Sequence, residues 1–280
     1  MKLILLILIT INSYAVYDSD SRQDYFEVES TLHKKLMKSM AYRVYKDELR
    51  GWTFNKYWRI VTKPLRDQGL CEGEKFIDQP SMRNGCSAIL VGKDLLLTAG
   101  NCTTEHYCWN DLFYWVFDYH IEKEGEFSNK IRNKKFYKCD KVLARVFDPS
   151  SAQSFALMKL KKEVRDREPI KFSSKKMLND EELVTLGHIR GSTLKYSDGA
   201  KAYDQDEKFF LANSDISGES KGSGIFNKST GELEGMMIYG TNNYFINNND
   251  CRELNEFKNN EAQELVIKSV YLKKLLKDFM

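Results

Sequence analysis

The sequence predicts an all-β fold, a sandwich or a barrel, because short apolar segments separated by polar turns recur along much of its length. Two of these segments, Cys86–Val91 and Leu95–Ala99, are joined only by Gly92-Lys93-Asp94, which is typical of a buried hairpin. Few segments have the length and the spacing of a helix. The other predicted strands are Phe113–Tyr119, Val142–Phe147, Phe155–Leu160, Leu183–Gly187 and Leu233–Tyr239.

The chain begins with the pattern of a secretory signal peptide. Lys2 precedes an apolar run from Leu3 to Ile11, and the small-residue ending Ser13-Tyr14-Ala15 follows. We therefore expect residues 1–15 to be cleaved off after Ala15 and the mature protein to be secreted or periplasmic. The run is too short to span a bilayer comfortably, and no later stretch approaches the ~20 apolar residues of a membrane helix. We expect no stable membrane span.

Residues 16–70 are predicted to form an N-terminal extension packed on a domain that comprises residues 71–280. Within the extension, Leu32, Leu36 and Met40 recur at helical spacing, and residues 41–45 then become strand-like. Residues 46–70 are rich in lysine and arginine, and we expect loops and a short strand there.

The C-terminal segment is the clearest exception to the β pattern. Its apolar residues Ile267, Tyr271, Leu275 and Phe279 recur every fourth position, which predicts a terminal helix with these side chains on its buried face. Its lysines are then expected on the solvent face: Lys268, Lys273, Lys274 and Lys277. A role at a membrane surface is the alternative to simple packing on the sheets, and packing is favoured.

Composition and charge limit the classes of function that the protein can have. The 280 residues are 42% hydrophobic and 30% charged, as in a globular protein, and the net charge of +3 falls to +2 if Lys2 is lost with the signal peptide. This charge is too small to indicate a nucleic-acid partner. Export makes disulfides the expected state of the 6 cysteines. No Cys-x-x-Cys pair or Cys/His cluster occurs in the sequence, so we expect neither a metal site nor a cofactor.

Three segments, in order along the chain, resemble the trypsin/chymotrypsin-like serine proteases and most closely their bacterial glutamyl-endopeptidase-like branch. Cys86 to Cys102 is similar to the family's segment that ends in Leu-Thr-Ala-Ala/Gly-His-Cys, and Ser154–Leu160 is similar to its Asp-x-Ala-Leu-x-x-Leu strand. Asp215–Asn227, which contains the turn Ser217-Gly218-Glu219-Ser220-Lys221-Gly222, is similar to the segment that carries the nucleophilic serine. The resemblance implies two perpendicular β-barrels, an active cleft between them and a C-terminal helix.

The resemblance also implies that the catalytic triad is replaced. The positions of the histidine, the aspartate and the serine are occupied by Asn101, Ser154 and Lys221. An amide has no basic nitrogen at accessible pH, a serine cannot orient an imidazole as a carboxylate does, and a protonated lysine is no nucleophile. Glu219 and Lys221 stand where backbone N–H groups would bind the oxyanion, and a carboxylate beside a developing negative charge is repulsive. We therefore predict a catalytically inactive homologue that acts as a binding or regulatory module.

An active serine endopeptidase is the alternative. Gly218-Glu219-Ser220-Lys221-Gly222 satisfies the Gly-x-Ser-x-Gly pattern, so a shifted alignment would make Ser220 the nucleophile. None of the histidines, His33, His106, His120 and His188, occupies the family's position for the base. A dyad of Lys221 with Ser220 or Ser223 also stays open.

Two further expectations follow from the resemblance. Ile238-Tyr239-Gly240 corresponds to the extended edge that pairs with substrate backbone, so an unknown protein or peptide could dock there; an ordinary core strand is the equal alternative. Cys86 and Cys102, 16 positions apart, match the disulfide that closes the family's histidine loop. The pairing of the other four stays open, with Cys108–Cys139 as a guess that would leave Cys71 and Cys251.

Overall fold

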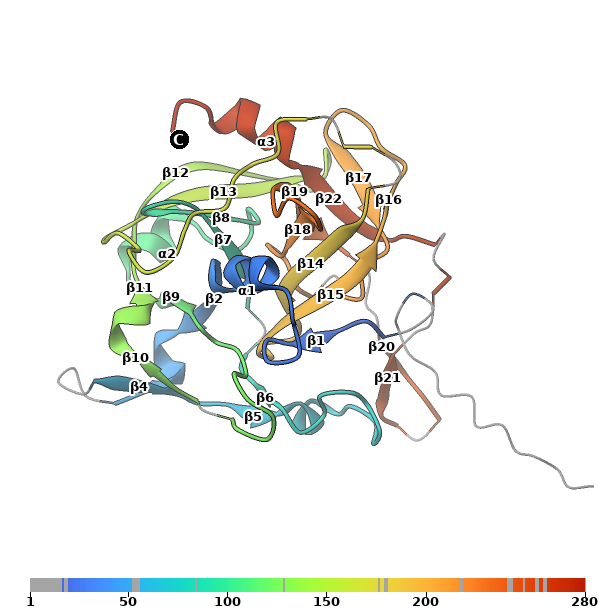
Figure 1. The fold of residues 1–280 in the computed structure, drawn as a ribbon. Coiled ribbons are helices and arrows are strands. Elements are labelled where there is room, and N and C mark those ends of the chain that lie inside the picture. The colour runs from blue at the N-terminus through green and yellow to red at the C-terminus, as the bar shows by residue number, and fades with distance from the viewer. Residues whose placement is uncertain are drawn as a thin grey trace, which may run out of the picture.

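The computed structural model describes residues 17, 20–51, 56–83, 85–127, 129–175, 177–178, 181–216, 219–240, 244–248, 250–254, 257–258 and 261–279. The predicted signal peptide, with its cleavage site after Ala15, and the residues Ser217 and Gly218 lie outside this part. Two large antiparallel sheets dominate the fold and curl into half-barrels that face each other (Figure 1). This is the chymotrypsin-like double β-barrel that the sequence predicts.

The first sheet has seven strands in the order β11-β9-β2-β7-β8-β13-β12. Its interior holds aromatic and apolar side chains such as Trp115, Phe117 and Met158, none of them exposed. The predicted hairpin is present, since β7 and β8 pair antiparallel. The strands are β2 (Met40–Tyr45), β7 (Ser87–Gly92), β8 (Leu95–Thr98), β9 (Phe113–Phe117), β11 (Phe136–Tyr137), β12 (Cys139–Asp148) and β13 (Gln153–Leu160).

The second sheet has eight strands in the order β1-β15-β14-β18-β19-β22-β17-β16. A continuous apolar cluster joins the two sheets, because Leu97 and Leu157 of the first pack with Leu186, Phe226 and Met236 of the second. The strands are β1 (Gln23–Asp24), β14 (Leu183–His188), β15 (Leu194–Ala200), β16 (Ala202–Tyr203), β17 (Phe209–Ala212), β18 (Gly224–Asn227), β19 (Leu233–Tyr239) and β22 (Glu264–Lys268).

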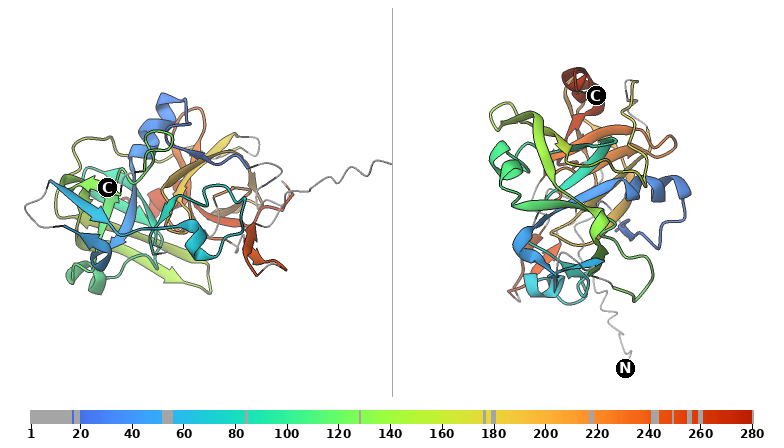
Figure 2. Two further views of the ribbon diagram at one scale, coloured as in Figure 1. Left: turned by 90° about the horizontal axis from the view of Figure 1, so that it is seen from below. Right: turned by 90° about the vertical axis from the view of Figure 1, so that its left-hand side faces the viewer.

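Smaller elements lie outside the two large sheets. β3 (Leu49–Arg50), β4 (Tyr57–Ile60) and β10 (Lys130–Arg132) form a three-stranded sheet. Two pairs of strands stand apart: β5 (Lys63–Pro64) with β6 (Pro80–Ser81), and β20 (Tyr244–Ile246) with β21 (Arg252–Leu254). The helices are α1 (Thr31–Lys38), α2 (Glu105–Trp109) and α3 (Ser269–Leu276), and 3₁₀ turns occupy Lys46–Glu48, Leu65–Gln68 and Asn133–Lys135. α1 and α3 lie on different sides of the molecule (Figure 2).

The N-terminal segment contributes one strand to each of the two large sheets. Its predicted helix is α1, in which the Ser30 hydroxyl caps the first turn by accepting a hydrogen bond from the His33 N–H at 3.3 Å. β2 lies between β9 and β7 in the first sheet, and β1 pairs with β15 at the edge of the second. The N-terminal segment therefore contributes strands to both large sheets.

The C-terminal helix is present, but its buried face differs from the prediction. Leu272 and Leu276 are fully buried, whereas Leu275 and Phe279 are 39% and 42% exposed. The reason is that β22 continues to Lys268, so Ile267 is a strand residue and does not share the helical register. Lys268 is also buried, with its ammonium donating to the Asp206 carbonyl, so the expectation that it lies on the solvent face is wrong. Among the described residues, no helix is long and apolar enough to cross a membrane.

Three disulfides crosslink the chain, and they include the expected Cys86–Cys102 bond. Cys108–Cys139 attaches α2 to β12, and Cys71–Cys251 joins positions 180 residues apart. These bonds fit an extracellular or periplasmic protein. No group of three His, Cys, Asp or Glu side chains placed to hold a metal ion occurs within the described residues.

Candidate functional site

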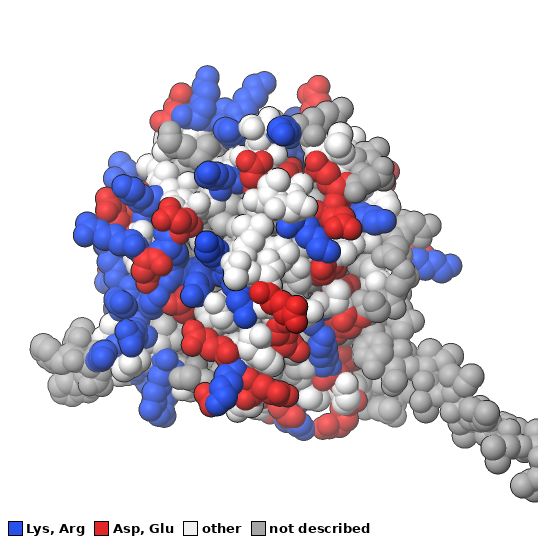
Figure 3. Space-filling model, in the orientation of Figure 1, with Lys and Arg blue, Asp and Glu red and all other residues white. Residues whose placement is uncertain are grey.

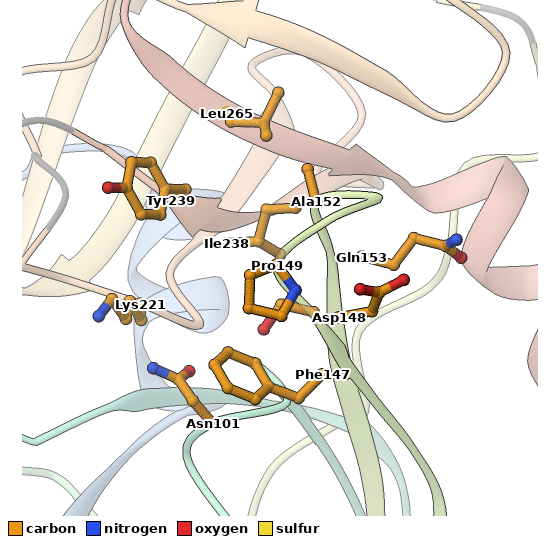
Figure 4. A pocket seen from close by; sticks show the side chains of 11 residues that line it. Asn101, Phe147, Asp148, Pro149, Ala152, Gln153, Lys221, Ile238, Tyr239 and Leu265 are labelled. Atoms are coloured by element: carbon orange, nitrogen blue, oxygen red, sulfur yellow. The ribbon is translucent and has the colours of Figure 1, made fainter.

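A cavity of about 400 Å³ opens where the two sheets meet (Figure 4). It brings together Asn101, Ser154 and Lys221 from three distant parts of the chain, and β19 adds Ile238 and Tyr239. Gly240, Glu219 and Ser220 do not line it. The remaining wall was not anticipated from the sequence; it consists of Phe147, Asp148, Pro149, Ala152 and Gln153 of the β12–β13 hairpin and Leu265 of β22.

The Asn101 loop is fixed to the β12–β13 hairpin by short hydrogen bonds. The Ser154 hydroxyl, which is buried, accepts a hydrogen bond from the Gly100 N–H at 2.9 Å. Arg145 donates to the Gly100 carbonyl at 2.6 Å and to the Thr103 carbonyl at 2.9 Å. Gly100 is required here because a Cβ would lie 1.9 Å from the Val146 carbonyl oxygen. Ser154 thus acts as a hydrogen-bond acceptor that holds the loop carrying Asn101.

The turn that carries Lys221 is held between the two sheets. The Lys221 carbonyl accepts a hydrogen bond from the Ser87 N–H of β7, and the Gly222 N–H donates to the Met237 carbonyl of β19, both at 2.9 Å. Gly222 has a φ of +84°, in the left-handed region that favours glycine. The Lys221 side chain is partly exposed and lines the cavity. It therefore remains available to a ligand.

The polar groups of the cavity are divided between its two ends. Asn101 and Lys221 lie side by side at one end with Tyr239 nearby, and Asp148 and Gln153 lie at the other (Figure 4). Hydrogen bonds from the hydroxyls of Ser150 and Ser151 lower the pKa of the Asp148 carboxyl to about 2, so it is ionised at neutral pH. Between the ends lie the apolar side chains of Phe147, Pro149, Ile238 and Leu265.

Ser220 belongs to the turn that carries Lys221, but it does not line the cavity. It has no exposed surface, and its hydroxyl has no hydrogen-bond partner among the described residues. Ser223 is buried too, and its hydroxyl donates to the Ser220 carbonyl at 2.6 Å. Glu219 points to Arg190, with 2.5 Å between a guanidinium nitrogen and a carboxylate oxygen. Its negative charge is thus compensated by the protein.

All four histidines belong to the described part of the chain, and none of them lines the cavity. His33 bonds to the Lys228 carbonyl, His106 lies exposed on α2, and His120 stacks on Tyr25. His188 is fully enclosed, and burial holds its pKa well below the ordinary value. Its Nδ1 lies 3.0 Å from the Ser87 hydroxyl, which makes a buried link between β14 and β7.

The two half-barrels, the loops that meet at the cavity and the terminal helix define the trypsin-like serine protease fold. Among solved structures, the chain is similar to the Vibrio cholerae VesB protease, with a TM-score of 0.52 over 92% of this chain and 67% of that chain. The sequence identity is 10%, so this likeness shows the fold alone. No protein-family profile and no curated protein sequence matches the chain.

Proposed function

We propose that this protein is a secreted serine protease homologue without catalytic activity, and that its cleft binds a segment of another protein or a peptide. The observation that carries the proposal is the lining of the cavity, where an amide, a hydroxyl and an ammonium occupy the three positions that correspond to the triad, and where the described residues supply no imidazole. Acyl transfer needs a base within hydrogen-bond reach of a nucleophile. Neither Asn101 nor Ser154 can serve as that base.

The environment of Glu219 and Ser220 supports the same conclusion. The Glu219 carboxylate and its Arg190 partner occupy the turn where a protease presents backbone N–H groups to an oxyanion. Ser220, the nucleophile of the alternative endopeptidase, has no surface through which to meet a carbonyl carbon. A working site would require this turn to be rebuilt.

The strand edge beside the cavity supports peptide binding. β18 starts at Gly224, which pairs with Met236 of β19, so residues 238–240 continue past the end of β18. Tyr239 is 64% exposed, while Ile238 is buried and lines the cavity. An extended segment could add to this edge through main-chain hydrogen bonds, with apolar side chains against Phe147 and Pro149.

Labelling with a fluorophosphonate probe tests the absence of activity, because the probe reacts only with an activated serine. We expect neither labelling nor hydrolysis of casein by the mature chain, as in a Ser220→Ala variant, while an active trypsin-like protease serves as the positive control. Labelling of the unmodified chain that disappears in the Ser220→Ala variant would instead establish the endopeptidase.

A further inference from the structure

The three-stranded sheet β3-β4-β10 has one apolar and one basic face. Leu49, Ile60 and Ile131 are buried in a core with Trp58 packed against them. Because side chains alternate along a strand, the intervening residues point away from this core. Those residues are all exposed, and they are Arg50, Tyr57, Arg59, Lys130 and Arg132.

The strand register places three cations in one row. Arg59 of β4 lies directly opposite Arg50 of β3 on one side and opposite Lys130 of β10 on the other. Neighbouring strands are ~4.8 Å apart, so the row concentrates positive charge within ~10 Å. Like charges directly opposite each other destabilise a sheet. The row therefore concentrates positive charge on the exposed face of this sheet.

The row lines a depression of about 460 Å³, whose wall consists of Arg50, Gly51, Lys56, Tyr57, Arg59 and Lys130. No carboxylate from the described residues lines it. The carboxylate of Asp47, which precedes β3, is paired with Arg83 at 2.8 Å. Arg50 donates to the carbonyls of Asp47 and Leu49, at 2.6 and 3.1 Å, which positions its guanidinium without removing its charge.

The surroundings extend this positive region. Lys and Arg side chains gather at the side of the molecule where β4, β10 and β11 lie, with some Asp and Glu side chains among them (Figure 3). Lys134 and Lys162 on this side are exposed, and Lys162 lies over the Tyr137 ring at 4.4 Å. A long polyanion could thus continue from the depression over the neighbouring surface. The small net charge of the whole chain conceals this local concentration.

We propose that this basic depression binds a sulfated polysaccharide. A sulfate group has three terminal oxygens, so one group can bridge cations on two adjacent strands, and guanidinium forks match such oxygens in pairs. The Tyr57 ring offers a flat surface to a sugar unit. The Lys56 ammonium, 5.9 Å from the centre of that ring, offers a cation. This site is separate from the cavity at Lys221, so the proposal does not depend on the proposed function.

The shape of the face favours a polysaccharide over other polyanions. Single-stranded nucleic acids are bound on several stacking aromatic side chains, whereas Tyr57 is the one aromatic residue among the described residues that line the depression. A bilayer surface is broad and flat, whereas these cations gather round one depression, which suits a discrete sulfate group. A protein partner would need an apolar anchor, which the described residues of this lining do not supply.

Retention on immobilised heparin and the salt dependence of its Kd test the proposal with the full mature chain. We expect binding that weakens about tenfold in the Arg50→Gln/Arg59→Gln double variant, with a salt slope shallower by about one per removed cation. The matched control is Lys141→Gln. Lys141 is also an exposed strand cation opposite another lysine, Lys159, but lies outside the depression, so this variant should bind unchanged.

Thermal unfolding supplies a readout that does not depend on the resin. The double variant should unfold at a slightly higher temperature than the unmodified chain in low salt, because repulsion within the row is relieved, and a given heparin concentration should stabilise it less than the unmodified chain. Unchanged heparin binding by the folded double variant would overturn the site. Stronger binding to single-stranded DNA, to hyaluronate or to anionic vesicles than to heparin would overturn the assignment to sulfated polysaccharide.

Discussion

At the cavity, single residues decide between chemistry and binding. Asn101, Ser154 and Lys221 each take part in holding or lining the site, yet none can exchange a proton with another in the manner of a triad. Ser154 retains one function that a carboxylate could also perform, since it accepts the hydrogen bond from the Gly100 N–H. Glu219 has become part of an ion pair with Arg190. Ser154 and Glu219 therefore also hold neighbouring segments in place, and replacing them affects the stability of the fold as well as the site.

Building a triad at the three corresponding positions tests the proposal that the protein keeps the protease scaffold without its chemistry. We expect a variant with Asn101→His, Ser154→Asp, Lys221→Ser and Glu219→Gly to fold and to show weak labelling by a fluorophosphonate. Asp at 154 can keep the bond to Gly100, whereas removal of Glu219 leaves Arg190 without its carboxylate and costs roughly 1–3 kcal/mol.

Labelling should remain weak because a placement error of about 1 Å can lower the rate 10²-fold. The matched control carries Lys221→Ala in place of Lys221→Ser and should not label at all. A folded variant with the complete triad and no labelling would mean that the replaced positions do not face one another as the resemblance implies.

At the scale of elements, the cavity depends on contacts between strands and turns that are remote in sequence. The β12–β13 hairpin forms one wall and is tied to α3, because the Tyr271 hydroxyl donates to the Gln153 side-chain oxygen at 3.0 Å. The turn before β18 is held against β7 on one side and β19 on the other. The close approach of this turn to β7 requires Gly222.

Gly222→Ala should therefore be strongly destabilising. A Cβ at this position would lie 2.0 Å from the Ser87 carbonyl oxygen and 2.7 Å from the Thr98 hydroxyl. The control is Gly199→Ala, whose φ of +79° is similar but whose Cβ would meet nothing within 4 Å.

We expect Gly199→Ala to lower the free energy of unfolding by about 1–2 kcal/mol through its left-handed backbone. Gly222→Ala should cost a further ~1–3 kcal/mol or more through overpacking, as measured by urea unfolding. Equal losses in the two variants would contradict the close contact between the Lys221 turn and β7.

At the scale of the whole molecule, the N-terminal segment joins the two half-barrels. β2 is internal to the first sheet, and β1 carries Asp24 to the second, where it forms a buried ion pair with Lys195 at 2.6 Å. Lys195 has no exposed surface and also donates to Gln79 and Thr193, both at 2.7 Å. Burial lowers the pKa of the Lys195 ammonium to about 8, although Asp24 acts in the opposite direction.

Asp24→Asn should lower the free energy of unfolding by about 3–5 kcal/mol at pH 6.5, because it leaves a buried ammonium without its carboxylate. The loss should be smaller at pH 9.5. The pKa of Lys195 is about 8 in the folded chain and 10.5 when unperturbed, so between these values the unfolded chain binds more protons and stability rises with pH. In the Asp24→Asn variant the pKa of Lys195 falls further. At pH 9.5 the folded variant therefore holds Lys195 as a neutral amine, and no unpaired charge is buried.

The exposed ion pair between Asp78 and Arg66 provides the control for this experiment. Asp78→Asn should cost less than about 1 kcal/mol at both pH values, because solvent screens the pair. Urea unfolding of both variants measures the difference. A loss in Asp24→Asn that is independent of pH would show that Lys195 does not titrate in this range.

The sequence by itself determined the features that repeat locally or rest on a fixed spacing. The hairpin of β7 and β8, the strands β13, β14 and β19 and the helix α1 were predicted, because each pattern is complete within a short segment. The Cys86–Cys102 disulfide was expected from the resemblance to the protease family, and it is present. The resemblance also selected Asn101, Ser154 and Lys221, which the structure brings to one cavity.

Only the tertiary structure decided how distant segments meet. Phe147 and Leu265 entered the cavity wall through the pairing and bending of strands, and the buried face of α3 was set by where β22 ends. The row of Arg50, Arg59 and Lys130 arises from the register of three strands whose sequences are separated by up to about 80 residues. Periodicity within one segment cannot specify such contacts, because the register depends on which side chains the partner strands bury together.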